Sequence, residues 1–188
     1  MSSRDELQQL KEDLVTLASG AGDEFGRLNV EQLNWKPAPE RWSVAQCFDH
    51  LVTSNASYFP VFDSVINGQK KSRAIERIPL LPNLWGMLLI KSLDPNATRK
   101  LKAPGRFQPS ASDISGSIIE DFVEQQTKLA ESIEAIKKLN PERIVITSPA
   151  ASMITYRLMD AFRIIVVHEK RHFQQAQRVT QEVKFPSN

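Results

Sequence analysis

The chain has 188 residues, of which 41% are hydrophobic and 24% are charged, and its formal net charge is +2 at pH 7. This length suits one domain over residues 1–188, and the small net charge leaves no electrostatic footprint for nucleic acid. A single cysteine, a polar amino terminus and the lack of a long apolar run favour a cytoplasmic protein without disulfides or a membrane span.

Two helices are predicted in the first part of the chain. Leucines at three- and four-residue steps over residues 7–17 predict a first helix, which weakens near Gly20. Ser43 and Gln46 match the capping box, in which two side chains three positions apart bind each other's backbone N–H groups, and they predict the start of a second helix. Apolar residues continue at helical spacing to Asn67. We therefore expect one unbroken helix of about six to seven turns.

Two more helices are predicted in the second half of the chain. The third begins near Ser110 or Ser112 and ends at Asn140, with apolar residues on one face and Glu and Lys residues on the other. The fourth runs from about Ile154 to Glu182. No convincing strand alternation occurs between them. The sequence therefore predicts an all-α protein.

A four-helix bundle is the expected architecture, because each of the four helices has an apolar face that must be covered. The second and third helices are joined by a long crossover, residues 69–110, which exceeds usual loop lengths and is expected to have a function. Within it, Asn83–Leu93 is predicted to form a short helix, and Arg99–Lys102 to be solvated or to contact an acidic cofactor. Residues 28–42 are expected to strap across the bundle end.

The three histidines indicate the chemistry of the protein. His168 and His172 are four residues apart in the fourth helix, so their rings lie above one another on one helix face. That face continues an apolar stripe, where a polar side chain needs a partner. His50 lies on the second helix, and facing helices of a bundle bring such side chains to one point. The pattern predicts a metal ion held by three imidazoles, with a coordination position left open for water or substrate.

The same residues also match a peptidase motif. His168–His172 reads as H-E-x-x-H, in which the glutamate of a metallopeptidase acts as general base, and Glu169 is then a candidate catalytic residue. Such enzymes usually take a third ligand from farther along the chain, where Glu182 is the sole acidic residue. Glu169 also fits an ordinary helix-surface residue, because it is rotated by about 100° from His168.

Four other side chains are expected to be structural. Trp42 is predicted to pack at the bundle end, and Cys47 to be a buried structural cysteine in preference to an additional metal ligand. Tyr58 and Gln175 are predicted to fill the core. The alternative for both is a hydrogen bond to a histidine ring or to a metal-bound water.

Two segments resemble the signatures of a known family. Trp42–Leu51 (WSVAQCFDHL), preceded by Asn34–Pro39 (NWKPAP), and His168–Gln175 (HEKRHFQQ) resemble the DinB-like (YfiT-like) metalloenzymes, in the order and spacing of that family. The resemblance implies an up-down-down-up four-helix bundle with a divalent ion bound by the three histidines. Imidazole ligands suit zinc, nickel and iron, and we expect zinc or nickel. The resemblance also implies frequent dimerisation and thiol-dependent transferase or isomerase chemistry, with bacillithiol, mycothiol or glutathione as the low-molecular-weight thiol.

Three functional hypotheses result. The first is a homodimeric metal-dependent enzyme, a thiol S-transferase or a hydrolase, that activates a thiol or water against a small-molecule substrate. The second is a metal- or ligand-binding stress protein without turnover. The third is a purely structural bundle whose histidines make ordinary hydrogen bonds. An H-E-x-x-H peptidase is the least favoured reading.

Overall fold

The computed structural model describes residues 2–95, 105–110 and 113–187, which are mostly helical and include one small two-stranded sheet. The elements, in chain order, are α1 (Ser3–Phe25), α2 (Val30–Asn34), α3 (Val44–Ala56), α4 (Phe59–Ile66), the 3₁₀ helix η1 (Ala74–Arg77), α5 (Leu81–Leu93), the 3₁₀ helix η2 (Gly105–Phe107), α6 (Ile118–Ile136), β1 (Val145–Thr147), β2 (Thr155–Arg157) and α7 (Leu158–Thr180).

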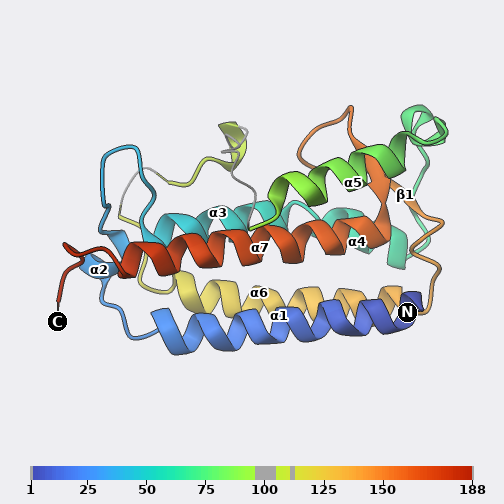
Figure 1. The fold of residues 1–188 in the computed structure, drawn as a ribbon. Helices are drawn as coiled ribbons and strands as arrows, with labels where there is room; N and C mark the ends of the chain where they lie inside the picture. Colours follow the sequence, from blue (N-terminus) through green and yellow to red (C-terminus); the bar gives the residue numbers. More distant parts are fainter. Residues whose placement is uncertain (1, 96–104, 111–112, 188) are drawn as a thin grey trace.

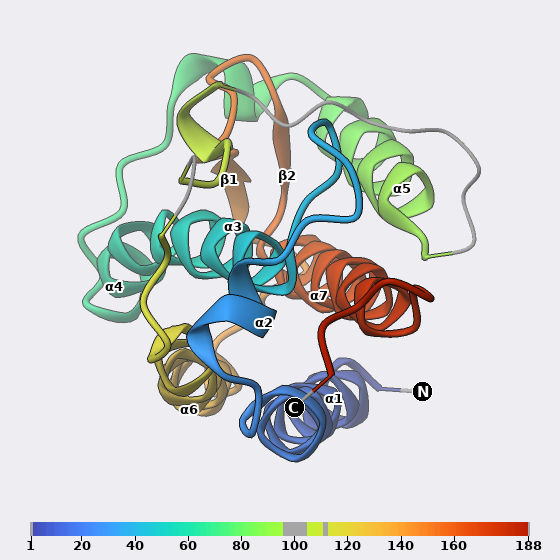
Figure 2. The same cartoon turned by 90° about the vertical axis from the view of Figure 1, so that its left-hand side faces the viewer.

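The long helices are arranged in layers. Helices α1 and α6 lie side by side, and α3 and α7 pack together on top of them (Figure 1). Helix α5 and the β1–β2 hairpin lie against the other face of α3 and α7, as the view along the helices shows (Figure 2). The α3–α7 pair is therefore covered on both sides.

Buried apolar side chains form two clusters that follow one another along the helices. One cluster takes the amino-terminal halves of α1 and α7 with the carboxyl-terminal half of α6, and the other cluster takes the opposite halves. Three buried polar side chains lie between the two clusters, on α3, α6 and α7: Asn55, Gln126 and Glu169. These side chains therefore form a polar layer across the core, about halfway along the helices.

The second predicted helix is broken in the structure. Helix α3 ends at Ala56 and α4 begins at Phe59, so the expectation of one unbroken helix to Asn67 is wrong. Pro60 stands in the first turn of α4. Its ring cannot donate a backbone hydrogen bond to the preceding turn, so the helix must restart there.

The third and fourth helices begin later than predicted. Helix α6 starts at Ile118, not near Ser110, and Ser112 lies outside the described residues. Before α7, the chain forms the antiparallel hairpin of β1 and β2, in which Ile146 pairs with Tyr156. The expectation of no strands is therefore wrong. Each strand has three residues, which is too short for a readable alternation.

The crossover contains the predicted short helix. Helix α5 spans Leu81–Leu93, two residues longer at its start than expected, and packs on α7 and β2. The basic run Arg99–Lys102 lies outside the described residues. Within the ranges that the structure does describe, no helix combines the length and the apolar character needed to cross a membrane.

Gly86 allows α5 to pack closely on α7, and its replacement by alanine is expected to destabilise the fold by about 1–3 kcal/mol through overpacking. A Cβ atom there would lie 2.5 Å from Asp160 Oδ2. Asp160 is held in place, because its Oδ1 accepts a hydrogen bond of 2.6 Å from Arg163. Gly22→Ala in α1 is the matched control, since nothing lies within 4 Å of its Cβ position. The control should be stabilised by about 0.5–1 kcal/mol.

Urea unfolding measures both variants. Two changes of the same sign would contradict the close α5–α7 contact, because helix propensity alone stabilises both alanine variants.

Candidate metal centre and cavity

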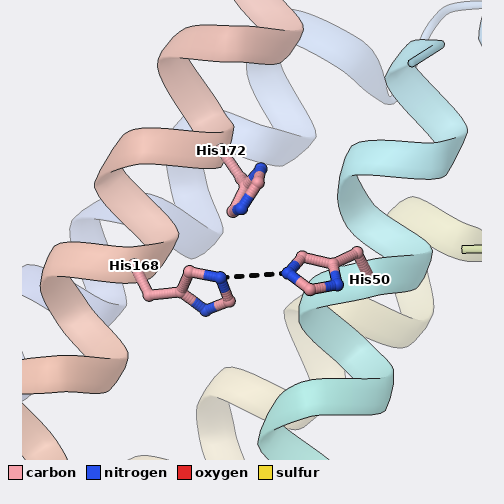
Figure 3. Close-up of side chains that lie close together, drawn as sticks. All are labelled: His50, His168 and His172. Carbon is pink, nitrogen blue, oxygen red and sulfur yellow. Dashed lines mark hydrogen bonds between the residues drawn. The ribbon is translucent and has the colours of Figure 1, made fainter. Parts of the chain in front are cut away.

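The structure brings the three predicted histidines together. His50 comes from α3, and His168 and His172 come from successive turns of α7 (Figure 3). One ring nitrogen from each lies within 4.8 Å of the others, and the His50 and His168 Nε2 atoms are 3.0 Å apart. His50 and His172 are buried and His168 is partly buried.

Local sequence sets the position of His50. The capping box predicted for Ser43 and Gln46 is present, with hydrogen bonds of 3.1 and 3.2 Å, and it fixes the start of α3 about two turns before His50. Ser110 is tied to the same helix by hydrogen bonds from its backbone N–H to Asp49 (2.8 Å) and to its carbonyl from Gln46 (2.9 Å). These contacts hold the segment around η2 against the histidine.

In two of the rings, the Nδ1 nitrogen makes a hydrogen bond outside the histidine cluster. His50 Nδ1 lies 2.6 Å from the Phe107 carbonyl oxygen, and His172 Nδ1 lies 3.1 Å from Gln175 Oε1. Because both partners are acceptors, each Nδ1 carries the proton and donates it. The Nε2 lone pairs of these two rings then face the third histidine, as metal ligands require.

The environment favours the neutral, ligand form of all three rings. Burial lowers the pKa of His50, although the Phe107 carbonyl and Asp49 oppose the shift. Burial is also the main cause that lowers the pKa of His172 to about 3, assisted by the charge of His50. The pKa of His168 falls well below its usual value because of burial and the neighbouring histidines. At neutral pH the three rings are therefore uncharged, as metal ligands must be. His50 Nε2 accepts the hydrogen bond of 3.0 Å from His168 Nε2–H, so this proton must leave that nitrogen if an ion binds there.

The separations fit a shared ion. Two imidazole nitrogens bound to one ion at about 2.0–2.1 Å lie at most about 4.2 Å apart. The His50–His168 separation of 3.0 Å meets this limit, and the ligand atoms of the whole set, within 4.8 Å of one another, exceed it by at most about 0.6 Å (4.8 minus 4.2). Trp42 supports the cluster, because its ring stacks on that of His172 at 5.3 Å and contacts that of His50 at 5.0 Å.

The histidines open into a cavity of about 1000 Å³. Its described lining comes from α3, α5, α7, β2 and the loops beside them, and none of it comes from α1 or α6. The site therefore lies on the face of the α3–α7 pair that α5 and the hairpin cover. We expected the ligands to lie on the apolar stripe that faces the bundle core. They lie instead on the face of α3 and α7 that borders the cavity.

Glu169 is fully buried, so its interpretation as a helix-surface residue is wrong. Its Oε1 accepts hydrogen bonds from Asn55 Nδ2 at 2.7 Å and from Gln126 Nε2 at 3.0 Å. It is absent from the described lining of the cavity. Burial raises its pKa to about 8, although the two hydrogen bonds oppose the shift. A carboxyl group that faces the core and stays protonated at neutral pH does not suit a general base.

Three other side chains were expected to be structural, and the structure places one of them, Gln175, in the site. Cys47 is buried, as expected for a structural cysteine, and burial strongly raises the pKa of its thiol. The Tyr58 hydroxyl bonds that of Tyr156 at 2.8 Å. Gln175 lines the cavity and bonds His172, so its interpretation as core filler is wrong.

Sequence reasoning missed two contributors to the site. Phe107 acts through its backbone carbonyl, which every residue has, so its side chain gives no signal. Tyr156 lies in a strand too short to predict and reaches the cavity through the hairpin.

Comparison with known proteins agrees with these motifs. The model of the DinB superfamily matches residues 7–176, which include all three histidines. An uncharacterised protein of Bacillus subtilis (strain 168), YuaE, is 30% identical over 165 residues, covering 86% of this chain and 91% of that protein. No solved structure matches the chain significantly. By the extent of the family match and of this relative, the chain belongs to the DinB superfamily.

Proposed function

We propose that His50, His168 and His172 bind one divalent metal ion, zinc or nickel, and that the protein is a metal-dependent enzyme. Its reaction is the transfer of a low-molecular-weight thiol to a small electrophile, or the hydrolysis of a small substrate. The observation that carries the proposal is the convergence of three neutral imidazoles at the wall of a cavity of about 1000 Å³. An ion alone does not need such a volume.

The proposed chemistry divides between the ion and the chain. A divalent ion supplies Lewis acidity, which makes water or a thiol a better nucleophile at neutral pH. The Phe107 carbonyl and Gln175 hold the tautomers of two histidines. Trp42 restricts movement of two of the rings by packing against them. Three protein ligands leave room for a substrate atom, as catalytic sites require and closed structural sites do not.

We also propose that α1, α3, α6 and α7 form the four-helix bundle of a single domain. The colours of Figure 1 support up-down-down-up connectivity, because α1 and α7 run in one direction and α3 and α6 run in the other. The contacts of α1 with α6 and α7, and of α3 with the same two helices, support a shared core.

A non-catalytic binding protein is the second candidate. It is favoured by the scarcity of acid–base groups near the histidines. Among the described lining residues, the one carboxylate is that of Glu40, which is exposed. The peptidase reading loses support, because Glu169 faces Asn55 and Gln126 in the core.

Metal analysis of protein prepared without a histidine tag tests the proposal. We expect about one zinc or nickel ion per chain, and loss of the ion in His168→Ala but not in Gln174→Ala, an exposed change on the same helix. Turnover of a model electrophile with bacillithiol, mycothiol or glutathione should be lost in the same histidine variant. A metal content below about 0.2 per chain, with no uptake on adding either ion, would refute the metal site. A full metal content without turnover by any of these thiols, or by water, would favour the binding protein.

A further inference from the structure

The two ends of the cavity differ in chemistry. Helix α7 lines it from Ile164 to Val179, a length of about 22 Å along the helix. His168 and His172 lie near the middle of this stretch, and His50 faces them from α3. A molecule that fills the cavity must therefore pass the histidines with one part on each side.

The end near the start of α7 is apolar. Ile164 and Ile165 face Leu89 and Leu93 of α5 across this part of the cavity. Tyr58 and Tyr156 close it, and their hydroxyl groups satisfy each other at 2.8 Å. None of the described lining residues on this side of the histidines carries a charge. This end offers aliphatic and aromatic surface to a ligand.

The end near the carboxyl terminus of α7 carries positive charge. Arg41 and Arg178 line it, with Glu40 as the one carboxylate among the described lining residues, whereas Arg171 lies level with the histidines, between His168 and His172 on α7. The charge of Arg41 is offset by its ion pair with Glu182. Arg171 donates a hydrogen bond of 2.9 Å to the Asp94 carbonyl oxygen, which leaves its charge in place.

Arg178 is the lining cation available to a ligand. Within the described part of the chain, its guanidinium makes no ion pair and no hydrogen bond. Side chains on a helix point toward its amino terminus, so Arg178 extends back toward Gln175 and the histidines. A guanidinium in this position suits the oxygen atoms of an anion.

We propose that the cavity binds an anionic amphiphile, with its anionic group at Arg178 and its apolar part between α5 and the first half of α7. The reactive bond then lies between these two parts, beside the histidines. This last assignment rests on the proposed metal-dependent function, whereas the binding itself does not. A volume of about 1000 Å³ accommodates both parts at once, since pockets for small ligands span about 300–1,000 Å³.

Three probes test the proposal by titration calorimetry: 1-octanesulfonate, methanesulfonate and 1-octanol. A sulfonate is a weak metal ligand, so its binding reports the arginine end and not the histidines. We expect 1-octanesulfonate to bind at least about tenfold more tightly than either of the other probes, because only it engages both ends. Comparable affinities for 1-octanesulfonate and 1-octanol would overturn the proposal.

Three variants locate the two ends. Arg178→Gln should weaken 1-octanesulfonate binding about tenfold and leave 1-octanol unaffected. Arg143→Gln is the control, because it removes the same charge from an exposed arginine that does not line the cavity. Leu93→Asn should weaken both octyl probes. Equal effects of the two arginine variants, or unchanged binding in Leu93→Asn, would refute the assigned ends.

The titrations are carried out with chelator present and again after loading with zinc. Binding of 1-octanesulfonate with the expected pattern in both states supports the proposal even if the protein binds no metal. Loss of this pattern in a protein that holds one zinc ion per chain would refute the ligand class alone. The two proposals can therefore fail separately.

Discussion

Glu169→Gln is expected to remove a loss of stability that the wild-type protein shows as the pH rises from about 5 to 8. Burial raises the pKa of Glu169 to about 8 in the folded protein, from an ordinary value of 4.5. Below pH 4.5 the carboxyl group is protonated in both states, and folding is not penalised. Between these pH values the unfolded chain loses a proton that the folded protein keeps, so unfolding becomes more favourable. Above pH 8 the effect is constant.

The size of the effect follows from the same values. The separation between 4.5 and about 8 corresponds to a decrease in the free energy of unfolding on the order of 5 kcal/mol across this pH range. The hydrogen bonds that Asn55 and Gln126 donate to Oε1 favour the charged form, so burial dominates over them in setting the raised pKa of Glu169. Glutamine reproduces this pattern, with its carbonyl oxygen in the place of Oε1 and without a titrating group.

Urea unfolding from pH 5 to 8, with chelator present, measures the effect. The control is Glu131→Gln, an exposed change on α6. Any contribution of the histidines to the pH dependence is common to all three proteins and cancels in the comparison. Parallel curves for wild type and Glu169→Gln would mean that Glu169 is charged in the folded protein, contrary to its burial.

Glu169 also bears on the metal centre through the fold. Its hydrogen bonds join α7 to Asn55 of α3 and to Gln126 of α6, between the two hydrophobic clusters. An apolar helix contact tolerates several registers, whereas a buried polar layer is satisfied in one. The layer lies beside His168, so it helps to hold α3 and α7 in the register that brings His50 to the α7 histidines.

Some features could be predicted because they depend on residues close in sequence. The spacing of Leu7, Leu10 and Leu14 indicates a helix, and the capping box at Ser43 marks a helix start. The spacing of His168 and His172 places both on one face. Pro60 also indicates a helix break, because its ring prevents a backbone hydrogen bond to the preceding turn. The apolar residues around it continue at helical spacing, however, and so favour one unbroken helix.

Other features depend on partners far apart in sequence. Glu169 is buried because Asn55 and Gln126 come to it from two other helices. The bond from His50 to the Phe107 carbonyl depends on a backbone atom. Helical spacing shows that the histidines share a face, but the position of α5 decides that this face borders a cavity. Such information lies in the packing and not in any short segment.

His172→Ala is expected to abolish the stabilisation that zinc gives to the wild-type protein. A ligand present at a thousandfold excess over its dissociation constant stabilises the folded state by about 4 kcal/mol, provided that it does not bind the unfolded chain. Removing one of three ligands leaves two imidazoles, so the zinc affinity should fall by at least about a thousandfold. This loss is larger than that expected when a residue that only hydrogen-bonds a ligand is removed. Urea unfolding with and without zinc measures the stabilisation, and competition with a chelating dye measures the affinity.

Gln175→Ala should give an intermediate result, because it removes the acceptor for His172 Nδ1 but no ligand. Loss of such an outer partner typically weakens metal binding by about 10–100-fold. Gln174→Ala, an exposed neighbour on α7, should behave as wild type. If Gln175→Ala matched this control, the hydrogen bond to His172 would have no part in orienting the ring. Retention of zinc stabilisation in His172→Ala would show that the ion binds elsewhere, and the three-histidine centre would have to be abandoned.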